Sequence, residues 1–287
     1  MNEKVKKPSA FKEFYKKFIK HRLAMISLFI IIIEILAVIL LPLVLNLDPY
    51  TCTTSYDAAP GAEHLFGTDT IGRDMFSRVV YGGRTSLLVG FAACAVSVLI
   101  GLPLGLIAGY YRGTAEAVIM RTADIFMSFP SMILTIVAAA IFGSSIPILI
   151  VLIGLLHWPQ PARLVYGKVL SVRKMEYVEA AKAEGISPFK IILKYILPNS
   201  IAPLWMSMAF MVSSDMITES SLSFLGCGVK TPMASWGNIV YNAQNIVVLR
   251  AYPWEWIPAG VCLIITVVCI NFVGEGIRDA LDPKMKR

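Results

Sequence analysis

Long apolar runs constrain this chain more than any other feature. Runs near 20 residues in length with few charges recur along its 287 residues, beginning with residues 23–45. A helix of about 20 apolar residues spans the hydrocarbon core of a bilayer, so lipid is the expected surrounding of these runs. The composition agrees, because 56% of the residues are hydrophobic and 16% are charged. We therefore predict an all-α integral membrane protein.

Six transmembrane helices are expected. After residues 23–45, the sequence predicts them at about residues 86–110, 117–142, from 146 onward, 201–225 and 256–273. Basic residues gather in residues 1–22, between 163 and 194, and after 278, and positive charge favours the cytoplasmic side. Both termini are therefore expected in the cytoplasm. The net charge of +7 has this simple cause, so it does not require a nucleic-acid partner, and none is expected.

The N-terminal region divides into two parts. Residues 1–22 are basic, and Phe11, Phe14, Tyr15 and Phe18 are spaced to form an aromatic face, so an amphipathic helix at the inner membrane surface is expected. The run at residues 23–45 is too long for a signal-peptide core and is expected to remain as the first transmembrane helix. Within it, Glu34 stands alone. Packing or pairing against another subunit is one interpretation, and a transport role is the other.

Residues 46–85 are expected to form an extracytoplasmic loop that contains an interfacial helix. The spacing after Asp69 is helical, and Gly82 and Gly83 are expected to end this helix before the next transmembrane helix. The five cysteines form no CxxC pair and the three histidines lie far apart, so no metal site is expected. A disulfide between Cys52 and Cys227 remains open, with nothing else to support it.

A polar, basic stretch at residues 176–199 lies between two expected transmembrane helices. Good helix formers end at Gly185, where a left-handed C-cap residue belongs, and Ser187 and Pro188 suit the start of a second helix. The stretch therefore predicts a helix, a tight bend and a helix. Phe189, Ile192, Leu193 and Ile196 are expected to form the apolar face of the second helix. A solvated connector and a docking element for a partner are both consistent with this pattern.

The transmembrane helix at residues 201–225 is unusually polar in its outer half. Asp215 and Glu219 lie four residues apart and share a helix face, so they are expected to line a water-filled path or a subunit interface. Ser214 and Met211 are the other candidates for a translocation pathway. His157 lies beside Pro159, where the helix is disturbed, and is expected to be a packing residue with a hydrogen-bond partner.

Four stretches resemble known transport proteins. Glu179-Ala180-Ala181, followed by Gly185 and then Leu197-Pro198, resembles the loop with the Glu-Ala-Ala motif in bacterial ABC importer permeases, although Tyr195 stands where that pattern has isoleucine. Residues 67–87, residues 219–239 and the C-terminal residues 281–287 resemble the C-type permease subunit of dipeptide, oligopeptide and nickel ABC importers. Through these four separate stretches the resemblance covers nearly the whole chain.

The resemblance implies the type I ABC importer permease fold in the bacterial cytoplasmic membrane. Residues 86–287 would form the permease core of five transmembrane helices, and residues 172–198 the cytoplasmic coupling loop seated in a cleft of an ATPase subunit. The coupling residues it implies are Glu179, Ala180, Ala181, Gly185, Ser187, Pro188, Leu197 and Pro198. Further implied partners are a homologous second permease subunit in a heterodimer, two ATPase subunits, an extracytoplasmic substrate-binding protein and the lipid bilayer.

The sequence contains no phosphate-binding GxxxxGK[ST] loop and no Ser/His/Asp or HExxH pattern. We therefore expect a transport subunit that is not an enzyme and binds no cofactor, with ATP and magnesium held by the partner ATPases. Peptide is the expected cargo, and nickel or another small solute is the alternative. A gradient-driven transporter that uses Glu34, Asp215 and Glu219 is the main competitor from another class. A membrane-embedded enzyme and a channel are less favoured because no catalytic or selectivity-filter pattern stands out.

Overall fold

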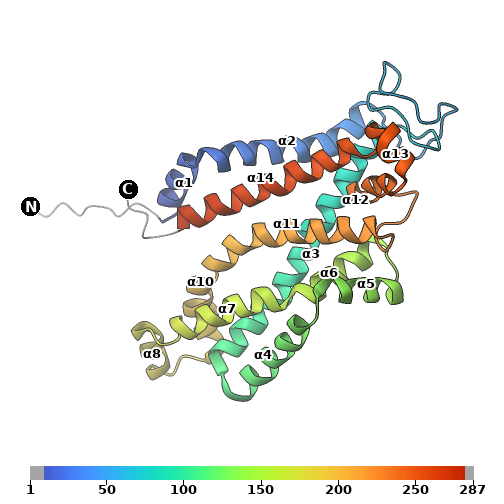
Figure 1. Cartoon of the computed structure of the whole chain (residues 1–287). Helices are drawn as coiled ribbons and strands as arrows, with labels where there is room; N and C mark the ends of the chain where they lie inside the picture. Colours follow the sequence, from blue (N-terminus) through green and yellow to red (C-terminus); the bar gives the residue numbers. More distant parts are fainter. Residues whose placement is uncertain (1–9, 282–287) are drawn as a thin grey trace, which may run out of the picture.

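The computed structural model describes residues 10–281, which are mostly helical (Figure 1). Within this range no β-strand forms, and only two isolated bridges connect residues 52–74. Four segments are long and apolar enough to cross a membrane, and two further helix pairs qualify if each bent pair counts as one crossing. The expected number of six is therefore the upper count by length and composition.

The unbroken candidates are α2 (Arg22–Val44), α3 (Met75–Tyr111), α6 (Ile146–His157) with α7 (Pro159–Val172), and α14 (Ile257–Leu281). The bent pairs are α4 (Gly113–Ser128) with α5 (Ser131–Phe142), which meet at 88°, and residues Pro188–Ser200 with α11 (Ala202–Phe224), which meet at 61°. The shorter elements are α1 (Ala10–Lys20), α8 (Glu176–Ala183), α9 (Pro188–Ile191), η1 (Ile192–Ile196), α10 (Leu197–Ser200), α12 (Trp236–Val240), η2 (Tyr241–Gln244), α13 (Ile246–Ala251) and η3 (Pro253–Glu255).

The elements have two distinct ends (Figure 1). At one end lie α1, α8 and the last turns of α14; we call it the α8 end. The opposite end carries residues 46–74 and the short elements α12 and α13, and we call it the loop end. Helices α2 and α14 run side by side from one end to the other, and α1 packs on α14, where Phe18 lies against Gly276.

Helix α3 is the central element, because α2, α6, α7 and α11 all pack against it. Three glycines one turn apart, Gly101, Gly105 and Gly109, let α7 approach its backbone. A Cβ atom at Gly105 would lie 2.5 Å from the carbonyl oxygen of Ala162. The hydrophobic effect does not drive helices together within lipid, because lipid tails are as apolar as the side chains. Close backbone packing of this kind is therefore a main source of helix association.

The prediction that Gly82 and Gly83 end a separate interfacial helix is wrong. Helix α3 starts at Met75, capped by the Asp74 carboxylate, and continues through both glycines to Tyr111. Its 37 residues extend about 55 Å, well beyond the roughly 30 Å hydrocarbon core. The two glycines serve packing instead, since a Cβ atom at Gly83 would lie 2.7 Å from the ring of Trp236.

The structure shows the surroundings of several side chains whose roles the sequence left open. Glu34 accepts a hydrogen bond of 2.8 Å from the hydroxyl of Thr266 on α14, so it has a partner within its own chain. Cys52 and Cys227 are both free thiols. The N-terminal amphipathic helix is observed as α1, where Phe14 and Phe18 stack at 6.0 Å, while residues 1–9 of the predicted segment lie outside the described residues.

Candidate functional site

The expected bend between two helices forms at the α8 end. Helix α8 ends at Ala183, and Gly185 takes the left-handed conformation with φ of 72°. Its backbone N–H donates to the carbonyl of Lys182 and that of Ile186 donates to the carbonyl of Ala181, which is the Schellman pattern of a glycine C-cap. Pro188 then begins α9 with Ser187 at the N-cap position, although within residues 10–281 the Ser187 side chain makes no capping hydrogen bond. The prediction of a helix, a bend and a helix is confirmed.

The predicted apolar face of the second helix contains both buried and exposed side chains. Ile192 and Ile196 are buried, but Phe189 is 70% exposed and Leu193 is 45% exposed. The face is therefore divided, because Ile192 and Ile196 belong to a buried hydrophobic cluster whereas Phe189 and Leu193 lie at the surface. The two exposed apolar side chains therefore stand at the surface near the exposed Lys190, where a partner could cover them.

The segment from α8 to α10, residues 176–200, packs against α3 and α7. Its buried side chains Val178 and Ile191 share one hydrophobic cluster with Val169 of α7 and Leu106 of α3. Arg173, between α7 and α8, donates to the carbonyl oxygen of Tyr110 at the end of α3 over 3.1 Å. A displacement of this segment would therefore reach α3 and α7.

The predicted coupling residues differ in exposure. Ala181 is buried and Leu197 is half-buried, whereas the others are exposed: Glu179, Ala180, Gly185, Ser187, Pro188 and Pro198. The structure thus leaves most of them available to another protein at the surface of the α8 end.

The four pathway candidates on α11 do not share one surface. Met211, Asp215 and Glu219 are buried at 2%, 1% and 0% exposure, while Ser214 is exposed. Glu219 accepts hydrogen bonds from Ser86 over 3.0 Å and from Ser223 over 2.8 Å, so it joins α3 to α11.

Asp215 is paired across the fold with His157, which lies 58 positions earlier in the chain. The Nδ1 atom of His157 lies 2.6 Å from Oδ1 of Asp215. The expected hydrogen-bond partner of His157 is therefore present. The expectation that His157 is only a packing residue is incomplete, because its side chain also lines a cavity.

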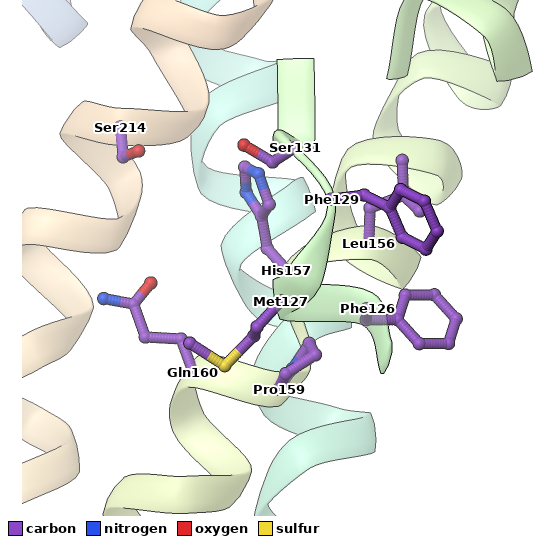
Figure 2. Close-up of a pocket in the computed structure, with 9 residues that line it drawn as sticks. All are labelled: Phe126, Met127, Phe129, Ser131, Leu156, His157, Pro159, Gln160 and Ser214. Carbon is purple, nitrogen blue, oxygen red and sulfur yellow. The ribbon is translucent and has the colours of Figure 1, made fainter. Parts of the chain in front are cut away.

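That cavity lies where helices are interrupted (Figure 2). It encloses about 330 Å³ at the break between α4 and α5, the junction of α6 and α7, and the face of α11 that carries Ser214. Its lining is Phe126, Met127, Phe129, Ser131, Leu156, His157, Pro159, Gln160 and Ser214. The sequence reasoning missed Ser131 and Gln160. Both residues lie next to a proline, which marks an interruption of the helix. Interrupted helices within a membrane are tolerated where they line a cavity or are covered by protein, so these prolines were the available signal.

Ion pairs join α4 to α7 nearer the α8 end. Arg121 and Asp124 of α4 form an ion pair at 3.7 Å, and Arg163 of α7 also contacts Asp124. Tyr166 of α7 donates to Glu116. Among the described residues, no group of three or more His, Cys, Asp or Glu side chains is placed to hold a metal ion.

A cluster of charged groups stabilises the loop end. Asp69 is fully buried and accepts from the Arg73 guanidinium over 2.7 Å, with Arg78 3.8 Å away. Glu255, also fully buried, faces Asp57 at the entry to α14. Burial, together with the neighbouring Asp57 carboxyl, raises the pKa of Glu255 to about 8 from its ordinary value of 4.5. At neutral pH Glu255 is therefore mostly protonated, which avoids a buried negative charge beside the Asp57 carboxyl.

Raising the pH should loosen the loop end. Because the pKa of Glu255 is raised on folding, its contribution to stability is fully present below pH 4.5 and is lost as the pH rises through about 8. We expect the thermal midpoint of the detergent-solubilised protein to fall between about pH 5 and about pH 8.5, as stability on the order of a few kcal/mol is lost. Glu255→Gln keeps the shape without the titration and should flatten this slope. Equal slopes for the two proteins would contradict the assignment.

Comparisons with known proteins agree with this geometry. Residues 101–287 match the family described as "binding-protein-dependent transport system inner membrane component", and residues 9–61 match the "N-terminal TM domain of oligopeptide transport permease C". The chain is 40% identical over 280 residues to the dipeptide transport system permease protein DppC of Alkalihalophilus pseudofirmus, covering 97% of this chain and 91% of that one. It is 38% identical to a protein described as a peptide permease in Brucella suis biovar 1, covering 93% of this chain and 89% of that one.

Solved structures agree with the fold. A chain of the MetNI methionine ABC transporter in an inward-facing conformation superposes with a TM-score of 0.59 at 22% identity, covering 72% of this chain and 98% of that one. A chain of an amino acid ABC transporter superposes with a TM-score of 0.51 at 13% identity, covering 70% of this chain and 92% of that one.

Proposed function

We propose, from the premise that this chain belongs to the family of binding-protein-dependent transport system inner membrane components, that it is the permease subunit of an ATP-driven importer of dipeptides or oligopeptides. The observation that carries the proposal is the 40% identity to a dipeptide permease over 97% of the chain. The apolar helices and the family place the chain in the bacterial cytoplasmic membrane as a multi-pass protein.

The proposed topology has six crossings with both termini in the cytoplasm. In it, the α8 end faces the cytoplasm and the loop end faces outward. The exposed Lys182, Lys190 and Lys194 support this orientation, because basic residues favour the cytoplasmic side. Each bent helix pair then counts as one crossing, and residues 23–45 and 86–287 correspond to the first transmembrane helix and the five-helix core.

The proposed assembly contains a second, homologous permease subunit, two ATPase subunits and an extracytoplasmic substrate-binding protein. The segment at residues 176–200 docks on an ATPase, since it exposes Phe189 and Leu193 in a polar surrounding. The substrate-binding protein docks on the loop end. ATP and magnesium stay in the ATPases, and this chain is a transport subunit without a cofactor of its own.

The mechanism follows from the rigid connections of the docking segment. ATP binding would draw the ATPases together and displace residues 176–200. The shared cluster with Val169 and Leu106, and the bond from Arg173 to Tyr110, would pass this displacement to α7 and α3. Both helices contact α6 and α11 beside the cavity, so the cavity would alternate in its exposure to the two sides of the membrane.

A gradient-driven transporter is the weaker alternative. Glu34 is hydrogen-bonded to Thr266, and Glu219 is enclosed by serine hydroxyls. These two carboxylates therefore have structural partners, whereas family membership favours an ATPase as the energy source. Asp215 and Ser214 remain the pathway residues that we propose, with the adjoining His157.

Co-purification tests the proposed assembly. The tagged chain is expressed in its own bacterium and isolated from membranes in mild detergent. We expect ATPase subunits and a second permease to be recovered in fixed ratio, as for an obligate interface. Isolation of the well-folded chain with neither partner would contradict the proposal.

A further inference from the structure

Two carboxylates on α11 lie one turn apart and differ in how they are satisfied. Glu219 is surrounded by hydroxyl donors, among them Ser86 and Ser223. Asp215 has one partner, His157, and its Oδ2 atom is buried without a hydrogen bond from any described residue. A buried carboxylate with a single hydrogen-bond partner costs folding free energy. A carboxylate with a purely structural role would be expected to have more donors around it, as Glu219 has. The difference points to a functional role for the pair.

The geometry fixes what His157 offers to the cavity. An ionised carboxylate only accepts hydrogen bonds, so the proton on the ring lies on Nδ1 and points to Asp215. In the neutral ring the other nitrogen, Nε2, is then an acceptor. Figure 2 shows the ring between Ser131 and the face of α11 that bears Ser214, and the Gln160 amide extends toward the same face. The cavity therefore offers several oxygen and nitrogen acceptors on this side.

The charge of the site selects the kind of group that would bind. The carboxylate of Asp215 lies directly behind the ring, and no lysine or arginine of residues 10–281 is among the residues that line the cavity. A negative charge in a low-dielectric surrounding attracts a cation strongly. An acceptor backed by an uncompensated carboxylate therefore suits a protonated amine better than a carboxylate or a neutral carbonyl.

We propose that His157, with its ring oriented by Asp215, contacts a protonated amine of the cargo, namely the N-terminal ammonium of a peptide, as it passes the cavity between α4–α5 and α11. The inference rests on the proposed function and adds to it a contact residue, a positioning residue and the group they recognise. The cavity volume of about 330 Å³ lies at the small end of ligand sites, which suits the terminal residue of a peptide and not a whole long one.

The test uses the complete complex in proteoliposomes with its binding protein, and the probe is Ala-Ala. His157→Phe removes the acceptor and Asp215→Asn reverses the ring tautomer by donating to Nδ1, so each should lower the uptake rate by roughly tenfold, the effect expected for one hydrogen bond to a charged group. His157→Gln retains an acceptor and should recover most of this loss. Wild-type rates in the first two variants, or equal losses in the Gln and Phe variants, would overturn the proposal.

A second pair of variants acts at Ser214, an exposed side chain in the wall of the cavity. Ser214→Lys brings its own ammonium into the cavity and should lower uptake about tenfold further than Ser214→Met, which measures the effect of bulk alone. Equal losses would overturn the proposal. The wild-type complex separates the two levels of inference: if it imports no Ala-Ala, the proposed function fails, and if it does while the variants behave alike, only this inference fails.

Discussion

Arginine in place of Gly185 should separate the chain from its ATPase subunits and abolish ATP-driven uptake. Gly185 lies at the exposed bend of the docking segment, and within the described structure a Cβ atom there would meet nothing within 4 Å. The chain itself should therefore still fold, at a cost of about 1 kcal/mol for a non-glycine residue with φ of 72°. A long cation inside a closely fitting interface costs more, so ATPase recovery in co-purification should fall at least about tenfold.

Gly185→Asn is the matched control, because asparagine tolerates the left-handed conformation and adds no charge. It should retain most of the ATPase and of the uptake. Loss of ATPase in both variants would show that the bend tolerates no side chain at all, and undiminished ATPase with arginine would contradict the placement of the interface.

Leucine in place of Gly105 should prevent stable folding. The site is closed by backbone, since the nearest atoms to a new Cβ are the carbonyl oxygen of Ala162 at 2.5 Å and the Cβ of Val165 at 2.9 Å. Helices α3 and α7 would have to separate along their contact, and we expect a loss of about 3 kcal/mol or more. The measurement is the fraction of monodisperse protein recovered after extraction, together with its thermal midpoint.

The control lies on the other helix of the same pair. A Cβ atom at Gly167 of α7 would meet nothing within 4 Å among the described residues, so Gly167→Leu should leave recovery and midpoint nearly unchanged. If Gly105→Leu were as stable as Gly167→Leu, the close approach of α3 and α7 would be refuted.

Local chemistry explains what could be predicted from the sequence. The apolar runs identified every segment that crosses in the proposed topology, because span length depends only on consecutive residues. Gly185 and Pro188 marked the bend correctly, since capping rules act within a few residues.

Long-range packing explains what could not be predicted. Gly82 and Gly83 looked like helix breakers, but Trp236, more than 150 positions later, fills the space beside them. Helical spacing put Phe189, Ile192, Leu193 and Ile196 on one apolar face, but it could not show that the fold buries only Ile192 and Ile196 of these four. His157 lies at the end of α6, and its partner Asp215 lies on α11. No sequence periodicity relates two residues on separate helices, so this pairing could not be predicted.

Uptake of a labelled dipeptide into proteoliposomes tests the central claim most directly. The purified chain is reconstituted with its second permease and ATPases, and the binding protein is supplied outside. We predict accumulation that requires ATP in the lumen, where the ATPases lie, and the binding protein outside, and that persists when ionophores remove every ion gradient. Accumulation that follows a proton gradient and proceeds without ATP would contradict the account.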